Sequence, residues 1–297
     1  MWKRLTFGPL MIAALIGLVW LDSFLGNKTL SSPVLGVDKV PPGSIVFLIC
    51  LALGALGSKE LASIIVAKGA KASAALLTLA SWAGLCVSFF APNAQHSIDS
   101  VAIVGSAAVL LFFTSLLVYS KGQNTKGVVL AAGASLLAFV YLGIMLGFVL
   151  AIRREHSVWI LLWLLLVVKA CDTGAYFTGR AIGKHKLILW LSPGKTWEGL
   201  VGGIALSCAA SVGGARLLTM WAGETMPGAL PLIVAGVVFA VVGQAGDLVM
   251  SLFKRDAGLK DSGSSIPGFG GVLDVLDSPL LVTPLAFWWL KWALPGA

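Results

Sequence analysis

Residues 158–177 read VWILLWLLLVVKACDTGAYF, and the run from Val158 to Val168 contains no charged residue. About 20 predominantly apolar residues in a helix are enough to cross the hydrocarbon core of a bilayer. The same segment carries Lys169 and Asp172 three positions apart, on one helix face. Ionisable groups at membrane depth are costly and usually mark function. This stretch therefore predicts a membrane helix with a polar site on it.

The rest of the chain has the same character. Of its 297 residues, 58% are hydrophobic and 11% are charged, against roughly 25% charged in soluble domains. This balance excludes a soluble globular enzyme and also a disordered chain, which needs low hydrophobicity and high charge. We expect an all-α polytopic integral membrane protein with about nine transmembrane helices. The apolar segments are Phe7–Leu25, Ser44–Gly57 (extending towards Val66 past Lys59 and Glu60), Ala72–Ala91, Val101–Tyr119, Gly127–Ile152, Val158–Phe177, Leu200–Trp221, Leu230–Phe253 and Pro279–Ala293.

Basic residues predict the orientation of these helices. When Lys and Arg are counted in alternate loops, fourteen fall on one side and six on the other, and the richer side is expected to be cytoplasmic. The N-terminus and the polar loops 178–199 and 254–278 then face the cytoplasm. We expect residues 1–156 to be a scaffold of membrane helices and residues 157–297 to be the catalytic membrane region.

The net charge of +8 has two explanations that remain open: a topology signal, or attraction to anionic lipid or nucleotide. The four cysteines, Cys50, Cys86, Cys171 and Cys208, are far apart and form no CxxC motif. Neither a disulfide framework nor a zinc site is expected.

Acidic residues concentrate in the second half of the chain. Eight of the thirteen lie between positions 172 and 277: Asp172, Glu198, Glu224, Asp247, Asp256, Asp261, Asp274 and Asp277. For the Lys169–Asp172 pair, a structural ion pair and a functional role both remain open. The glycines that follow, Gly174 and Gly179, predict that the backbone opens there towards a polar cavity.

A polar stripe interrupts the apolar segment that ends near Phe253. Gln244, Asp247, Ser251 and Lys254 are spaced by 3, 4 and 3 residues, so they lie on one face of a helix. A carboxylate in hydrocarbon needs a cation, and either a basic side chain or a metal would serve. Asp247 is therefore a candidate site residue.

Both polar loops have the composition of phosphate-binding segments. Loop 254–278 combines glycines and serines with Lys260, and its Asp274 and Asp277 are three apart, a spacing of hard oxygen ligands that suits Mg²⁺. Loop 178–199 contains the sequence SPGKT at 192–196. We therefore expect an intramembrane site that uses Mg²⁺ and a polyphosphate from the cytoplasm, with a second substrate arriving from lipid.

Four motifs resemble those of the phosphatidate cytidylyltransferases, the bacterial CDP-diacylglycerol synthases. They are CDTGAYFTGR at 171–180, LSPGKTWEG at 191–199, GQAGDLVMS at 243–251 and SLFKRDAGLKDSGSSIPGFGGVLDVLD at 251–277, the last of which resembles the signature of that family. The resemblance covers about residues 168–280. It departs at Phe269, where the family usually has His, and at Val275, where it usually has Arg.

The resemblance implies transfer of CMP from CTP to phosphatidate. It implies Mg²⁺ as the cofactor and leaves a second cation open. Asp247 and Asp274 match the residues that hold metal. The other implied catalytic residues are Asp172, Lys254, Arg255, Lys260, Asp261 and Asp277. The implied substrate-binding residues are Arg180, Ser192, Lys195, Gln244 and Ser251.

The implied partners are CTP, phosphatidate and membrane lipid, with no nucleic acid, and the resemblance also makes a homodimer plausible. Two alternatives remain open. One is a CTP-dependent lipid-alcohol kinase or another liponucleotide synthase, which needs the same cation and basic loops. The other is an ion or phosphate transporter, with Asp172 and Asp247 on the ion path.

Overall fold

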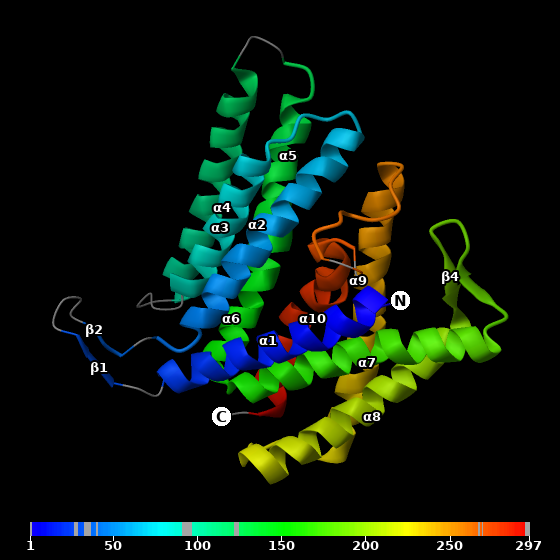
Figure 1. Ribbon diagram of the computed structural model, residues 1–297. Coiled ribbons are helices and arrows are strands. Elements are labelled where there is room, and N and C mark those ends of the chain that lie inside the picture. The colour runs from blue at the N-terminus through cyan, green and yellow to red at the C-terminus, as the bar shows by residue number, and fades with distance from the viewer. Residues whose placement is uncertain are drawn as a thin grey trace. The chain divides into compact units, whose positions relative to one another are not determined.

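The computed structural model describes residues 2–26, 29–32, 37–39, 41–90, 97–121, 125–266, 268 and 270–294. It divides the chain into two compact units, the first made of Met1–Arg154 with Asp256–Val275 and the second of Glu155–Arg255 with Leu276–Ala297. The expected functional division at residue 156 stays a prediction. Figure 1 shows that helices dominate the chain, as the sequence predicts.

The first unit consists mainly of helices. They are α1 (Trp2–Gly26), α2 (Ser44–Ala67), α3 (Ala74–Phe90), α4 (Ser97–Ser120), α5 (Val128–Ala138), the π-helical segment η2 (Phe139–Ile144) and α6 (Met145–Glu155, whose last residue falls in the second unit). A short antiparallel pair, β1 (Thr29–Ser32) and β2 (Val37–Lys39), follows α1. Lys59 and Glu60 do not interrupt α2.

Close backbone contact holds the middle of the first unit together. A Cβ atom on Gly84 of α3 would lie 2.7 Å from the carbonyl oxygen of Phe139 and 2.8 Å from the Cα of Gly143. Only glycines allow helices to approach so closely, and such small-residue contacts are typical of membrane helix packing.

The second unit contains α7 (Val158–Ile182), β3 (Lys186–Ile188), β4 (Ser192–Thr196), α8 (Trp197–Ala222), α9 (Ala229–Asp256) and most of α10 (Val272–Ala293). In Figure 1, α7 and α8 lie side by side, with the β3–β4 hairpin at one end of the pair. An aromatic cluster joins α7, α9 and α10: the rings of Trp163 and Trp289 stack at 5.7 Å, and Phe239 lies 5.8 Å from Trp289.

Among the described residues, eight helices are long and apolar enough to cross a membrane, and the apolar α3, with 17 residues, is shorter. Inside a bilayer a helix satisfies its own backbone hydrogen bonds, which explains why the apolar segments form helices. The predicted fold class, an all-α multi-pass membrane protein, is confirmed.

The two polar loops are shorter than the sequence indicates. α7 continues to Ile182 and the 186–196 segment forms the hairpin, so little of 178–199 is irregular. α9 continues to Asp256, which places Lys254 and Arg255 in its last turn, and α10 already begins at Val272.

Candidate active site

The glycines of the CDTGAYFTGR motif do not open the backbone, contrary to the sequence-based expectation. Residues 173–180 are a continuous part of α7. A Cβ atom on Gly174 would lie 2.7 Å from the carbonyl oxygen of Gly202, and one on Gly179 would lie 3.0 Å from Thr196 Oγ1. These glycines therefore permit close packing of α7 against α8 and its N-terminal cap.

The hairpin presents Lys195 to the polar stripe of α9. Lys195 Nζ lies 2.7 Å from Asp247 Oδ2 and 3.5 Å from the carbonyl oxygen of Gln244. The two charged side chains are only 17% and 31% exposed, respectively. The cation that Asp247 needs is thus supplied at least in part by Lys195, so the 192–196 motif and the stripe belong to one site.

Three structural features fix the position of Lys195. Lys186 pairs with Thr196 across the hairpin, and the Thr196 hydroxyl accepts the N–H of Gly199 (3.1 Å), which caps α8. Glu198, in the first turn of α8, accepts the backbone N–H of His185 and lies 2.6 Å from its ring nitrogen Nδ1. His185 therefore supports the hairpin.

Asp277 comes close to Asp247 within the second unit. A Cβ atom on Gly246 would overlap the carbonyl oxygen of Asp277, so α9 and α10 touch at this point. Asp277 is 4% exposed, and the charges of Asp247 and Lys169 both act on its carboxylate. The backbone N–H of Ser278 donates to Asp277 Oδ1 at 2.6 Å.

Lys169 and Asp172 complete this group of charges. Lys169 Nζ lies 3.1 Å from Asp172 Oδ2, and both side chains are 38% exposed. Cys171, between them, is within electrostatic range of Asp172, Lys169 and Lys195. We call Lys169, Asp172, Lys195, Asp247 and Asp277 the lysine–carboxylate cluster.

The remaining predicted residues of the second unit lie on the last turns of α7 and α9 and in strand β4. Arg180 is exposed and donates to the Tyr176 hydroxyl at 3.0 Å. Ser192 is half-buried in β4. Ser251 and Lys254 continue the stripe of α9 as half-buried residues, and Arg255 is exposed.

In the first unit, the carboxylate of Asp274 is held by the loop that precedes α10. Asp274 Oδ2 accepts the N–H of Ser262 (3.1 Å), the hydroxyl of Ser262 (3.0 Å) and the N–H of Gly271 (3.0 Å). Lys260 and Asp261 are exposed on the same loop, and Phe269 lies outside the described residues.

Sequence reasoning missed Glu60. Its carboxylate, in α2, accepts the Ser262 hydroxyl and the N–H groups of Val272 and Leu273. Its signal in the sequence is a single acidic residue in an apolar segment, which by itself indicates only an interruption of that segment.

Among the described residues, no three His, Cys, Asp or Glu side chains gather as a metal site. Mg²⁺, however, is usually held by one or two carboxylates together with waters and substrate phosphates. Asp247 and Asp277, two neighbouring carboxylates beside lysines, fit that requirement. Asp274 belongs to the other unit, so a metal shared by Asp247 and Asp274 stays a prediction.

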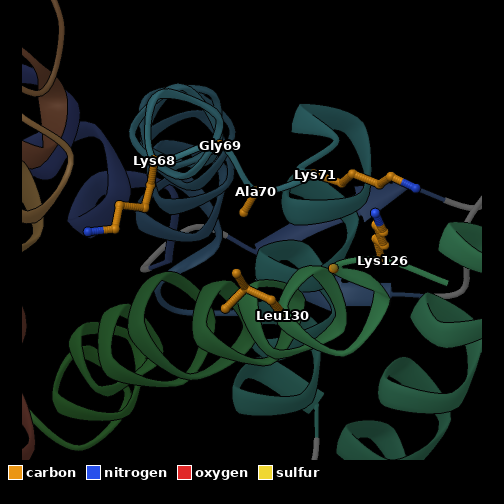
Figure 2. A pocket seen from close by; sticks show the side chains of 7 residues that line it. Lys68, Gly69, Ala70, Lys71, Lys126 and Leu130 are labelled. Carbon is orange, nitrogen blue, oxygen red and sulfur yellow. The ribbon is translucent and has the colours of Figure 1, made fainter. Parts of the chain in front are cut away.

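A pocket of about 300 Å³ in the first unit is lined by Lys68, Gly69, Ala70, Lys71, Lys126, Gly127 and Leu130. Figure 2 shows Lys68 extending away from Lys71 and Lys126. This pocket contains none of the predicted site residues, so its lysines add a basic surface and no part of the predicted chemistry.

The cytidylyltransferase family model matches residues 36–293, well beyond the motifs recognised in the sequence. A phosphatidate cytidylyltransferase of Staphylococcus epidermidis is 34% identical over 82% of this chain and 88% of its own length. That of Staphylococcus saprophyticus is 35% identical over 68% of this chain and 74% of its own.

The phosphatidate cytidylyltransferase of Haemophilus influenzae is 44% identical over 43% of this chain, and this match spans 44% of that protein. The family model begins at residue 36, so the likeness is not confined to the charged half. With a family model matched over most of its length, the chain belongs to the cytidylyltransferase family, alongside these phosphatidate cytidylyltransferases.

Proposed function

We infer that the protein transfers CMP from CTP to phosphatidate, giving CDP-diacylglycerol and pyrophosphate. Family membership and the names of the relatives support this activity. Within the molecule, the strongest support for this activity is the contact between Lys195 and Asp247 at 2.7 Å. It joins two of the family-like motifs into one charged site in an apolar environment.

The reaction places its main demand on positioning and cations. A phosphate oxygen of phosphatidate forms a bond to the α-phosphorus of CTP, while the bond from that phosphorus to the bridging oxygen of pyrophosphate breaks. The attacking oxygen is already anionic, so no strong general base is required. Bringing two anions together and stabilising the leaving group depend on positive charge and orientation.

The residues of the lysine–carboxylate cluster match these demands. Lys195 and Lys169 would contact substrate phosphates, and Asp247 and Asp172 would orient those ammonium groups. Arg180, Ser192, Gln244 and Ser251 would complete the substrate contacts, and Lys254, Arg255, Lys260 and Asp261 would act from the 251–277 motif.

Mg²⁺, bound by Asp247 and Asp277 or by Asp247 and Asp274, would neutralise phosphate charge. Lys195, which contacts Asp247, and Ser262, which donates to Asp274, would hold these carboxylates in the orientation that binds the metal. A second cation and a homodimer remain further parts of the proposal.

The basic residues support an orientation with the hairpin and the 251–277 motif on the cytoplasmic side. CTP would then enter from the cytoplasm and phosphatidate from the surrounding lipid. The eight long apolar helices found among the described residues fit a lipid substrate that stays in the bilayer.

The test is an assay of purified protein in detergent with CTP, phosphatidate and Mg²⁺, measuring pyrophosphate and labelled CDP-diacylglycerol. We expect both products with phosphatidate, and loss of both when EDTA removes divalent cations. A polyprenol replaces phosphatidate in a parallel reaction. Phosphorylated polyprenol without CDP-diacylglycerol would identify a lipid-alcohol kinase, and nucleotide-independent ion or phosphate flux in proteoliposomes would identify a transporter.

A further inference from the structure

Glu60 is a buried carboxylate in the last third of a helix long and apolar enough to cross a membrane. It lies in α2, seven residues before the end of that helix at Ala67, and is 5% exposed. A buried carboxylate is stable only when hydrogen-bonding partners replace the water that it has lost. The identity of those partners indicates what Glu60 does.

Two of the partners are the backbone N–H groups at the start of α10. The N–H of Val272 lies 2.8 Å from Oε1, and the N–H of Leu273 lies 3.0 Å from Oε2. The first N–H groups of a helix have no acceptor within the helix, and its N-terminus favours negative charge. Glu60 therefore caps α10 from a helix more than 200 residues away.

The third partner connects Glu60 to Asp274. The Ser262 hydroxyl lies 2.9 Å from Glu60 Oε2 and 3.0 Å from Asp274 Oδ2. Asp274 Oδ2 also accepts the N–H groups of Ser262 and Gly271. The loop that orients Asp274 is thus the same loop that Glu60 holds.

Two glycines show how closely the loop surrounds Glu60. A Cβ atom on Gly263 would lie 2.9 Å from Glu60 Oε1. A Cβ atom on Gly271 would overlap both Glu60 Oε2 and Ser262 Oγ. The absence of side chains at these positions allows the backbone to enclose the carboxylate.

We propose that Glu60 is a positioning residue: by holding Ser262 and the first turn of α10, it fixes the direction of the Asp274 carboxylate. The proposal rests on the proposed function, in which Asp274 takes part in holding Mg²⁺. It assigns a role in the site to the N-terminal helices, which the sequence presents only as scaffold.

The test compares Glu60→Gln with a matched control on the same helix, Ser58→Ala. Glutamine keeps the volume of Glu60 but places an N–H₂ group against a donor, so at least one of the three hydrogen bonds is lost. Ser58 is also buried, and its hydroxyl donates to the carbonyl oxygen of Leu77 at 3.1 Å, away from the loop. Ser58→Ala therefore reports the cost of losing a buried hydrogen bond in α2 alone.

Two measurements are made on purified protein. Hydrogen exchange is followed in peptides covering residues 260–275, and Mg²⁺ affinity in the presence of CTP is measured by calorimetry. Glu60→Gln should accelerate exchange in that segment and weaken Mg²⁺ binding about tenfold, as expected for a group that orients a metal ligand. Ser262→Ala should shift both readouts in the same direction by less, since its N–H remains, and Ser58→Ala should shift neither.

Unchanged exchange or unchanged Mg²⁺ affinity in Glu60→Gln overturns the positioning role, and so does an equal effect of Ser58→Ala. If Glu60→Gln does not fold, Ser262→Ala decides by the same two readouts. Formation of CDP-diacylglycerol by the wild-type protein is measured separately. Its absence counts against the proposed function and leaves the exchange and affinity results to decide the role of Glu60.

Discussion

Asp247 and Asp22 are both carboxylates of apolar helices, and each contacts a cationic side chain. For Asp247 the cation is Lys195, beside a second carboxylate, Asp277. For Asp22 it is Arg153, whose Nε lies 2.7 Å away. The two differ in their surroundings, because Asp247 lies in a polar cluster and Asp22 is enclosed by backbone donors.

Asn at Asp247 or at Asp274 should nearly abolish turnover while the protein still folds and inserts. Each substitution removes a negative charge that we propose holds Mg²⁺, and we expect a loss of at least about 100-fold in kcat. If both act on one metal, the double variant should be little worse than either single variant. Retention of most activity at saturating Mg²⁺, or losses that multiply, would contradict the shared site.

The control for that experiment should be Glu224→Gln and not Asp22→Asn. From the sequence alone, both substitutions are expected to be silent. Asp22, however, is 2% exposed and accepts the N–H groups of Gly43 and Ile45 in addition to Arg153. We therefore expect Asp22→Asn to lower stability by about 3 kcal/mol, as for a broken buried ion pair.

Thermal unfolding in detergent checks this expectation. A clear drop in Tm for Asp22→Asn and none for Glu224→Gln is the expected result. Equal Tm values for the two variants would show that the Asp22–Arg153 pair contributes little.

Phe269→His tests the departure from the usual family sequence. If the native protein is active, His is not required at this position, and the substitution should change the rate only modestly. A native protein without activity that gains it through Phe269→His would instead be a degenerate relative. The pyrophosphate assay distinguishes the two cases.

At the scale of elements, α7 and α8 pack through glycines, which gives a matched pair of substitutions on α8. A Cβ atom on Gly203 would lie 2.8 Å from the carbonyl oxygen of Cys171, whereas one on Gly213 would meet nothing within 4 Å. Gly203→Ala should therefore destabilise the protein by about 1–3 kcal/mol through overpacking. Gly213→Ala should be neutral or stabilising, because Ala favours a helix. Similar Tm shifts for both would argue against this packing.

The sequence predicts most helices but places several boundaries wrongly, for reasons visible at particular residues. Gly174 and Gly179 suggest a break in α7, yet they lie inside it because α8 packs against them. Glu60 suggests a weak second helix, yet α2 continues because distant donors satisfy its charge. In both cases a tertiary contact decides the local structure.

At the scale of the whole molecule, the distribution of Lys and Arg predicts the orientation in the membrane. Cysteine introduced at Ser192 or Ser264 should resist an impermeant thiol reagent applied outside intact cells, and Thr225→Cys on the opposite predicted side should react. The protein also has four native cysteines that could react, so labelling of the wild-type protein is measured as the background. Ready labelling of position 192 or 264 from outside would overturn the orientation.

The sequence by itself determined the membrane class and the helical fold, because apolar runs in a bilayer have few alternatives to a helix. It also determined which motifs carry charge, since ionisable groups stand out against an apolar background. The tertiary structure alone decided the partners of those charges. Lys195 meets Asp247 across 52 positions, and Glu60 meets Val272 across 212. The spacing of residues along the sequence indicates only which side chains share one helix face. The partners of Lys195 and Glu60 depend instead on how the hairpin and the helices pack.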